Sequence, residues 1–434
     1  MRKIILFLFL SAGFLGACKK DDHVFDKSPD ERINETLAAY QSTLQGSPAG
    51  WEATLTTGTG ALFNFHFRFN ESNRVFMFCD FDETTASEEK ESSYRLKSLQ
   101  QPVLIFDTYS YVHLLGDPNG LVNGGNDGEG LLTDFEYSLD TLYADSILLT
   151  GRFYGTKLKL VRASQEDYDA WQNGIWVSNL SFLKIQDILE YFKRFRLDGV
   201  TYELYVNPVT RTILINWESG GTVRSFTTRY YFDRTGLVFE QPLVNGSTTI
   251  TGFSDFEWNA GNHTMQMEVN GKTTTIAGAT APIRVDLNAP RRWWQTVANS
   301  DTYWISWNGF HVNGVDDAYG VNSIPNYYFM IFWPAFGTSG GIRYDLLGFV
   351  TYTSNGLALG FGAGYSPPQF TSDGRVIFDI LGILGTVPPE AEEVFEKTAI
   401  RLNDADGFYL VQTSAGTYDM VSADDARSWI NWTY

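Results

Sequence analysis

Alternation of apolar and polar residues with a period of two runs through most of the chain and predicts β-strands. The clearest case is Phe63–Phe69, in which every second residue is phenylalanine and the residues between are polar. In a strand the four phenylalanines share one face, which a core would cover. Further strands are expected at 75–78, 103–106, 303–307, 327–333 and 346–352, with a terminal hairpin around Ala415-Gly416.

Helical spacing occurs at fewer places. Ser28, Pro29 and Glu31 form a start signal, because a serine N-cap, a proline in the first turn and a glutamate three residues after the cap favour helix initiation. This first helix is expected to end near Gly46. Other helices are expected within 164–199, from about 288 to 297 and from 388 to about 402, whereas the glycine-rich segment 356–364 is expected to be a loop.

The chain also repeats itself. Residues 67–78 align without gaps on 204–215, and both segments have the pattern strand, Asn-x-x-x-Arg turn, strand. Asparagine at the start of such a turn can accept a hydrogen bond from its own backbone two residues on. Three later matches keep the same order: Arg95 with Arg229, 103–105 with 237–239, and 134–137 with 255–258. The sequence therefore indicates two copies of one β module, although chance similarity between short β segments is the alternative.

The expected fold class is α+β and mainly β. Two related antiparallel β modules are joined by helices, and a β-rich domain follows them. The expected boundaries are a signal peptide at 1–17, a lipidated tether at 18–25, an N-terminal helix with the first β module at 26–163, a helical connector at 164–199, the second β module at 200–280, and an aromatic-rich β domain at 281–434.

The first eighteen residues have the form of a bacterial lipoprotein signal. A basic start is followed by the apolar run Ile4–Leu15, which at about 18 Å is too short to cross a bilayer core of about 30 Å as a permanent helix. Gly16 and Ala17 precede Cys18, as expected where cleavage is followed by acylation of the cysteine. The alternative is an ordinary cleaved signal with a chance cysteine. We expect a lipid anchor at Cys18.

Charge and cysteine content narrow the choice of partners. The formal net charge is −19, and it becomes −21 once Arg2 and Lys3 are removed. An acidic body disfavours nucleic acid and anionic membrane surfaces as partners. With Cys18 acylated, Cys79 has no partner for an internal disulfide, and its position in an apolar strand predicts a small buried hydrophobic residue.

Several segments resemble an uncharacterised Bacteroidota lipoprotein family, one of the "domain of unknown function" families. The likeness covers nearly the whole mature chain and rests on Phe25-Asp26, Glu31-Arg32, Gly50-Trp51, the segment from 94–96 to 107–109, and 310–314. The resemblance implies a lipoprotein of the outer membrane, encoded near nutrient-uptake systems of the starch-utilisation type and often beside a predicted zinc peptidase. Lys20-Asp21-Asp22 also resembles the acidic surface-export signal of that phylum, so the body is expected to face outward. The resemblance implies no catalytic residue, because the family's motifs carry no known chemistry.

Motifs of common enzyme classes are absent from the sequence. The five histidines include no pair spaced as in His-Glu-x-x-His, and no phosphate-binding glycine motif occurs. A triad of distant serine, histidine and aspartate residues remains open, because triads are defined by geometry. No cofactor is expected.

Two acidic pairs recur in the two copies. Asp134 with Glu136, and Asp255 with Glu257, are each two residues apart, so both carboxylates of a pair would face one side of a strand. Such a pair can bind Ca²⁺ or serve as the acid and base of a glycosidase. The interpretation we favour is structural, with Phe135 and Phe256 buried on the opposite side, because a repeated motif marks a fold more readily than an active site.

Two further features are candidates for binding. The loop Asp117–Glu129, with Asp117 and Asp127, offers several oxygen ligands for a hard cation, although a solvated loop is favoured because the EF-hand pattern is absent. In the last third, tryptophans and tyrosines are dense, and exposed indoles would form a platform for sugars or proteins. The platform candidates are Trp293, Trp294, Trp304 and Trp307, and core packing is the favoured alternative.

These observations predict a non-catalytic, surface-anchored accessory protein that binds a glycan or a peptide for nutrient acquisition. Its partners would be the membrane, through the lipid anchor, and an outer-membrane uptake complex. A secreted hydrolase with dispersed carboxylates is one alternative, which two carboxyl groups facing a cleft would support. A structural subunit of an outer-membrane complex is another, and a broad exposed apolar patch would support it.

Overall fold

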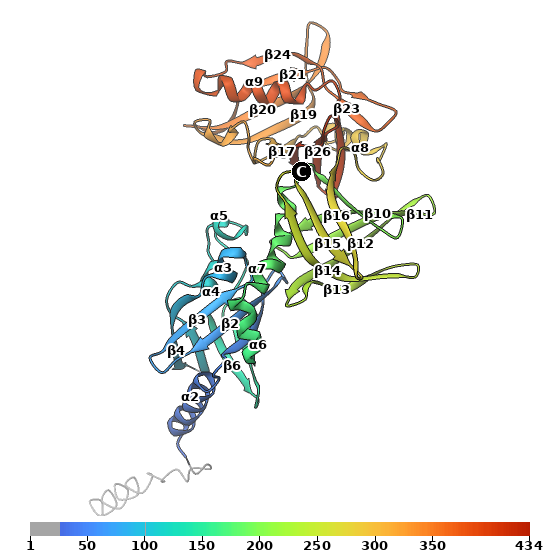
Figure 1. The fold of residues 1–434 in the computed structure, drawn as a ribbon. Coiled ribbons are helices and arrows are strands. Elements are labelled where there is room, and N and C mark those ends of the chain that lie inside the picture. The colour runs from blue at the N-terminus through green and yellow to red at the C-terminus, as the bar shows by residue number, and fades with distance from the viewer. Residues whose placement is uncertain (1–26, 100) are drawn as a thin grey trace, which may run out of the picture. The chain divides into compact units, whose positions relative to one another are not determined.

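The computed structural model describes residues 27–99 and 101–434, and Figure 1 shows their fold. The chain divides into two compact units. The first comprises the described residues up to Gly58 together with Asn64–Phe78 and Glu89–Asp169, and the second comprises Thr59–Phe63, Cys79–Glu88 and Ala170–Tyr434. Cys18, the expected lipidation site, lies outside the described residues.

Eight consecutive antiparallel strands form a closed barrel in the first part of the chain, and β1 pairs with β8 to close it. Helix α2 (Pro29–Gln45) precedes the barrel and begins with the predicted capping box, in which Ser28 and Glu31 exchange hydrogen bonds. The strands are β1 (Trp51–Thr56), β2 (Leu62–Phe69), β3 (Arg74–Cys79), β4 (Lys90–Ser98), β5 (Pro102–Phe106), β6 (Glu136–Leu142), β7 (Ser146–Gly151) and β8 (Lys157–Arg162), with short helices α3 (Glu83–Ser87), α4 (Tyr111–Leu115) and α5 (Gly120–Asn123) between them.

A second closed barrel of eight antiparallel strands follows, in which β9 pairs with both β10 and β16. Between the barrels in sequence lie α6 (Gln165–Gln172), α7 (Ile175–Leu180) and the 3₁₀ helix η1 (Ser181–Asp187). The strands are β9 (Phe192–Leu197), β10 (Val200–Asn207), β11 (Thr212–Ser219), β12 (Thr222–Asp233), β13 (Gly236–Asn245), β14 (Thr248–Asn259), β15 (Thr264–Val269) and β16 (Lys272–Ala279).

Strand β9 corrects the prediction that helix continues to about residue 199. Phe192 and Phe195 are three residues apart, a spacing that suits one face of a helix. In the structure Phe192, Phe195 and Leu197 are all buried in a strand that closes the second barrel. Tertiary pairing on both edges of β9 therefore decides its conformation, and the second module begins before residue 200.

The repeated segments occupy equivalent strands in the two barrels. Residues 67–78 lie in β2 and β3, and 204–215 lie in β10 and β11, which are the second and third strands of their barrels. The turn asparagines act as predicted: Asn70 Oδ1 accepts from Ser72 N at 2.9 Å, and Asn207 Oδ1 accepts from Val209 N at 3.0 Å. Arg95 and Arg229 lie in the fourth strands, β4 and β12.

The last third forms an eleven-stranded sheet whose core contains Trp293, Trp304 and Trp432. Helix α9 (Glu392–Leu402) packs through Phe395 on Phe349 and Phe361 of the sheet. The remaining elements are α8 (Ala289–Ala298), β17 (Trp304–Ser306), β18 (His311–Val312), η2 (Val321–Ser323), β19 (Tyr327–Ser339), β20 (Ile342–Thr353), β21 (Gly356–Tyr365), β22 (Gln369–Phe370), β23 (Arg375–Ile377), β24 (Ile380–Gly385), η3 (Pro389–Ala391), β25 (Phe408–Ser414), β26 (Thr417–Ser422) and β27 (Ser428–Thr433).

Strand β21 overturns the expected loop at 356–364. A Cβ at Gly362 would lie 2.5 Å from the carbonyl oxygen of Leu347, so glycine allows β20 and β21 to approach closely there. The prediction that the protein is mainly β is confirmed. In the described part of the chain, no helix is both long and apolar enough to span a membrane.

Candidate functional site

The most promising site is a groove of about 430 Å³ in the second unit, between the outer face of the second barrel and strands β25 and β27. We call it the barrel groove. Its lining combines aromatic rings, amides, hydroxyls and one lysine. The lining residues are Gln186, Tyr191, Lys193, Leu204, Tyr205, Val206, Asn207, Thr212, Leu214, Asn216, Thr227, Val411, Gln412, Thr413 and Trp429.

The pleat of β11 brings polar side chains to the groove. Ile213 and Ile215 are fully buried inside the barrel, so their neighbours Leu214 and Asn216 face outward. The register continues this outer row, because Leu214 pairs with Tyr205 of β10 and with Thr227 of β12. The alternation that fills the barrel interior therefore also builds the groove floor.

Three aromatic side chains form one end of the groove. The ring centroid of Tyr191 lies 5.9 Å from that of Tyr205 and 5.4 Å from that of Trp429. His311 stacks on Trp429 with a centroid distance of 3.7 Å. These contacts hold the rings in place, so the aromatic surface is ordered before any ligand arrives.

A buried carboxylate, that of Glu203, holds Tyr205 in place through a hydrogen bond. Glu203 is 1% exposed, and its Oε1 accepts from the Tyr205 hydroxyl at 2.7 Å. Its Oε2 accepts from Arg194 Nη2 at 2.7 Å and from the main-chain N–H of Ile283 at 2.8 Å. Burial and the nearby Glu203 charge raise the pKa of Tyr205 well above its usual value, so this hydroxyl stays protonated and donates to Glu203.

A second carboxylate holds Tyr191. Asp419 accepts from the Tyr191 hydroxyl at 2.6 Å and from the Asn431 amide at 2.6 Å. Burial raises the pKa of the Asp419 carboxyl and also that of the Tyr191 phenol. Both oxygens of Asp419 accept hydrogen bonds from side chains, and both oxygens of Glu203 accept hydrogen bonds from the partners named above. The two carboxylates thus act as supports for the tyrosines.

The first acidic pair is structural. Asp134 precedes β6 instead of lying in it, and it is 4% exposed. Its carboxylate accepts from the main-chain N–H groups of Phe153 and Tyr154 at 2.6 and 3.0 Å, and from the hydroxyl of Thr156 at 2.6 Å. Glu136 lies in the strand and forms an ion pair with Arg152 at 3.1 Å. The expected shared face is therefore wrong for this pair.

The second pair differs from the first. Asp255 is exposed and has a positive φ of 53°, at a register shift between Ser254 and Glu257 in β14. The shift breaks the two-residue alternation, so the two carboxylates do not form the predicted pair. Phe256 is buried as expected, whereas Phe135 is 46% exposed and stacks on His113, so its predicted burial is wrong.

In the candidate cation loop, the carboxylates of Asp117 and Asp127 accept hydrogen bonds from main-chain N–H groups of the same loop. Asp117 Oδ1 accepts from Asn119 N at 2.9 Å, and Asp127 Oδ1 accepts from Gly120 N at 2.9 Å. Asp117 also accepts from the Tyr109 hydroxyl, which lowers the pKa of its carboxyl. Across residues 27–99 and 101–434, no cluster of three or more histidine, cysteine or acidic side chains has the geometry to hold a metal ion.

The tryptophan platform does not form. Trp293 and Trp304 are fully buried, and the Trp304 indole donates to the Trp293 carbonyl at 3.0 Å. Trp294 donates to Asp345 at 2.7 Å. Trp307 is 49% exposed, and its ring contacts Tyr328 and Phe329. The favoured alternative, core packing, is thus confirmed for Trp293 and Trp304. Cys79 is fully buried, as predicted, and burial raises the pKa of its thiol well above the usual value.

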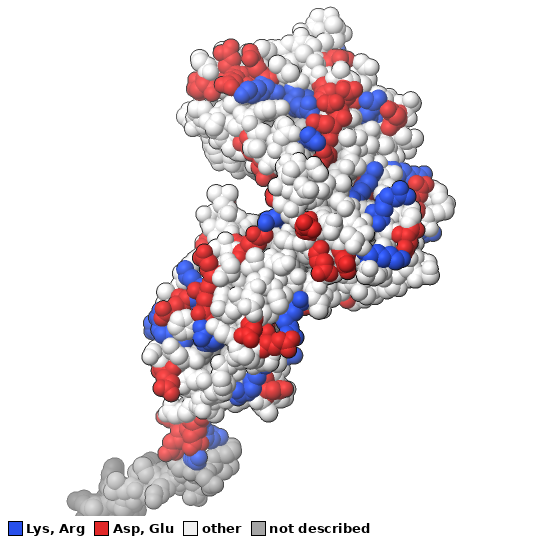
Figure 2. All heavy atoms as spheres, in the orientation of Figure 1, with Lys and Arg blue, Asp and Glu red and all other residues white. Residues whose placement is uncertain are grey.

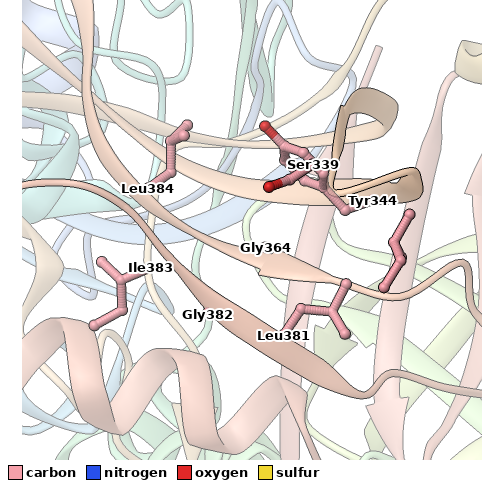
Figure 3. A pocket seen from close by; sticks show the side chains of 8 residues that line it. Ser339, Tyr344, Gly364, Leu381, Gly382, Ile383 and Leu384 are labelled. Atoms are coloured by element: carbon pink, nitrogen blue, oxygen red, sulfur yellow. The ribbon is translucent and has the colours of Figure 1, made fainter.

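A second hollow, of about 320 Å³, lies beside strand β24, and Figure 3 shows the side chains that line it. This strand ends the sheet path, and among the described residues its strand partner is β21 alone. Its sequence is Ile-Leu-Gly-Ile-Leu-Gly, and Ile380, Leu381 and Ile383 are 41%, 52% and 64% exposed. An uncharged, exposed apolar edge strand is unusual and marks a surface suited to a partner strand.

Charge is mixed on the face drawn in Figure 2. Acidic and basic side chains alternate with wide uncharged areas, and basic side chains gather over the part of the second barrel near β10 and β11. Sequence reasoning missed the barrel groove. The outward positions of β11 were visible as polar residues in an alternating strand, but nothing in the sequence showed that β25 and β27 lie opposite them.

Comparison with solved structures gives only weak likeness. The octameric penicillin-binding protein homologue from Pyrococcus abyssi is 7% identical over 35% of this chain and 37% of its own, with a TM-score of 0.15. The DnaN sliding clamp from Bartonella birtlesii is 9% identical over 92% of this chain and 97% of its own, with a TM-score of 0.17. The Helicobacter pylori beta clamp is 9% identical over 93% and 97%, with a TM-score of 0.13. TM-scores this low carry no argument about fold or function.

No curated protein matches the chain. The model of one family matches residues 21–260, which is more than half of the chain and includes the first barrel and the second barrel through the end of β14. The family is described as a domain of unknown function, DUF4302. This chain therefore belongs to the DUF4302 family.

Proposed function

We propose that the protein is a lipid-anchored accessory protein of a Bacteroidota outer membrane, which faces outward and binds a nutrient ligand without catalysis. The lipoprotein signal ending at Cys18 supports the anchor. Family membership together with the resemblance stated above supports the setting beside a nutrient-uptake system. The barrel groove supports the binding role, because preorganised aromatic rings and neutral polar groups share one concave surface.

A glycan fits this lining better than a peptide. Tyr191, Tyr205 and Trp429 offer flat apolar faces on which sugar rings stack, and Asn216, Gln412 and Thr413 offer amides and a hydroxyl for sugar hydroxyls. The single observation that carries the proposal is this pairing of fixed rings with uncharged hydrogen-bonding side chains in one groove of about 430 Å³.

The test is binding of the full chain to a glycan array and a peptide array, followed by titration of each hit. We expect a glycan hit that Trp429→Ala weakens at least tenfold and Asn216→Ala weakens less, as expected for loss of a stacking ring and of one hydrogen bond. Trp307→Ala is the matched control, because this indole is exposed outside the groove. Far-UV circular dichroism and thermal unfolding check that each variant folds.

Two results would count against the glycan proposal. If only peptides bind, the ligand of the groove is a peptide and not a glycan. If Trp307→Ala weakens binding and Trp429→Ala does not, the glycan binds outside the groove.

The anchor has its own test. Replacement of Cys18 by alanine removes the sulfur that is acylated, so we expect the protein to leave the membrane fraction or to remain unprocessed. Metabolic labelling with a fatty-acid analogue measures this directly. Normal labelling of the Cys18→Ala protein would refute the anchor at that residue.

Strand β24 favours a second candidate function, that of a subunit in a larger outer-membrane assembly. A partner could add a strand to its free edge, where main-chain groups give affinity and apolar side chains give specificity. Ile383→Lys should then abolish co-purification with that assembly from membranes. Ile400→Lys, which changes an equally exposed isoleucine on α9, should leave it intact. Equal recovery of the assembly with both variants would remove this candidate.

A further inference from the structure

One cation lines the barrel groove, and its charge is not matched by a neighbouring carboxylate. Lys193, the second residue of β9, is half-buried. Its Nζ donates to the main-chain oxygen of Glu190 at 3.1 Å. Over residues 27–99 and 101–434, no carboxylate forms an ion pair with this ammonium group.

The ionisable groups around Lys193 are already committed to other partners. Glu190 pairs with Arg427 at 2.6 Å, and Glu203 pairs with Arg194 at 2.7 Å. Asp419 receives hydrogen bonds from Tyr191 and Asn431. The hydroxyl of Tyr205 donates to Glu203. Each acid in this region therefore has a donor of its own, and the ammonium of Lys193 is the charge left facing the groove.

Partial burial of this ammonium has an energetic consequence. Desolvation, the larger effect, lowers the pKa of Lys193 to about 8, while the charge of Glu190 acts in the opposite direction. A cation that has lost water without gaining a counter-ion binds an incoming anion more favourably than an exposed lysine does. Lys193 lines the same groove as Tyr191 and Tyr205, so an anion paired with its ammonium group would share that groove with the aromatic rings.

We propose that the barrel groove selects an oligosaccharide that carries a carboxylate, such as a uronic acid residue, and that Lys193 pairs with this carboxylate. The inference rests on the glycan-binding function proposed above. A single ammonium is a point charge that matches one carboxylate. The net charge of −19 disfavours densely charged polyanions, for which one cation would be too few.

The test compares acidic and neutral probes that share a sugar backbone and differ by one carboxylate. Galactotriose is compared with the same trisaccharide carrying one terminal galacturonate, and cellotriose with the same trisaccharide carrying one terminal glucuronate. Binding to the full chain is measured by calorimetry at pH 7. We expect one acidic probe to bind roughly 10- to 100-fold more tightly than its neutral partner, as for one charge-assisted hydrogen bond in a partly desolvated site. Lys193→Met, which keeps the apolar stem, should remove this preference, and Lys193→Arg should keep most of it.

Lys184→Met is the matched control, because Lys184 lies outside the groove lining and forms an ion pair with Glu83 at 2.9 Å. It should leave the preference unchanged. The acidic preference should also depend on pH. Since the ammonium of the free protein loses its proton near pH 8, affinity for the acidic probe should fall about tenfold for each pH unit above 8, whereas affinity for the neutral probe should stay constant.

The outcomes separate this inference from the function on which it rests. Equal affinity for acidic and neutral probes, with both weakened by Trp429→Ala, would overturn the role of Lys193 and leave glycan binding intact. A preference that survives Lys193→Met would also overturn it. If neither the probes nor the glycan array gives a hit that depends on Trp429, the glycan function and this inference both fail.

Discussion

Strands β2 and β10 hold the same place in the two barrels, yet their outer faces are covered in different ways. In the first barrel, Arg68 faces outward and lies over the ring of Tyr168 of α6 at 5.0 Å, and it pairs with Glu89 at 2.6 Å. The aligned residue in the second barrel is Tyr205, which lines an open groove. A helix therefore covers one copy, whereas the other copy keeps a concave surface.

The difference shows where a repeated module is free to vary. Inward residues of both strands are buried and apolar, as Phe67 and its counterpart Leu204 illustrate, because each must fill a barrel interior. Outward residues carry no such constraint. The first copy uses them for packing on a helix and the second for a polar groove, so the second barrel is the better place to look for function.

The largest effect should come from the arginine of the repeated turn. Arg211 of the second copy is 2% exposed and binds Asp80, at 2.9 Å between Nη1 and Oδ2, whereas its counterpart Arg74 forms a half-exposed pair with Glu91. Loss of a partner from a buried pair costs about 3–5 kcal/mol. We expect Arg211→Met to lower the free energy of unfolding by this amount, measured by urea denaturation of the full chain.

The matched variant Arg74→Met should change that free energy by about 0–1 kcal/mol, because a surface pair contributes little. Similar losses for the two variants would mean that the turn itself, and not the burial of its arginine, sets the cost. The two copies would then be more alike than their surroundings indicate.

The acidic motif gives the next contrast. Asp134→Asn replaces one buried carboxylate oxygen by an amide NH₂ group. The N–H and hydroxyl of Thr156, which donate to Asp134, would then face a donor instead of an acceptor. We expect the free energy of unfolding of this variant to fall by about 2–3 kcal/mol, the range for loss of a charged hydrogen bond that leaves a buried partner unsatisfied. Asp255→Asn should stay within about 0.5 kcal/mol, because that residue is exposed and asparagine tolerates a positive φ. Thermal unfolding of both proteins measures the difference, and equal shifts would contradict the structural role of Asp134.

The smallest effect concerns the helix cover of the first barrel. Tyr168→Leu removes the ring beneath Arg68. We expect the free energy of unfolding to fall by about 0.5–1 kcal/mol, the usual contribution of a partly exposed cation–π contact. Tyr143→Leu is the control, because Tyr143 is 51% exposed. Thermal unfolding is the measurement, and binding of any glycan found for the groove should be unchanged by either variant. A change in that binding with Tyr168→Leu would place a ligand on the first barrel as well.

Local rules predicted much of the fold because they act through neighbouring residues. The capping box of α2, the paired Asn-x-x-x-Arg turns and the strands of both modules follow from spacing and side-chain chemistry alone. Strand β9 was misread because its apolar residues suit a helix equally well, and only pairing with β10 and β16 decides between the two. The glycines of β21 were misread because their close packing depends on β20, which no local pattern reveals.

The barrel groove could not be predicted from the sequence either, because residues far apart in the chain form it. Glu203 and Asp419 are more than two hundred residues apart in sequence, and each supports one of two tyrosines that meet in space. The acidic pairs and the tryptophans stood out by sequence proximity, but hydrogen bonding and burial assign most of them to structure. A lysine or an asparagine in a strand carries no mark of function until its surroundings are known.

Residues 59–63 and 79–88 precede the second barrel by about a hundred positions, yet they belong to its unit, and Asp80 among them meets Arg211. A shortened chain that starts at residue 170 would therefore keep the guanidinium and discard the acid that neutralises it. A protein shortened in this way for crystallisation or for a binding assay would lack Asp80, the carboxylate that pairs with the buried Arg211. The two units are interleaved in sequence, so no single cut in the chain separates one complete unit from the other.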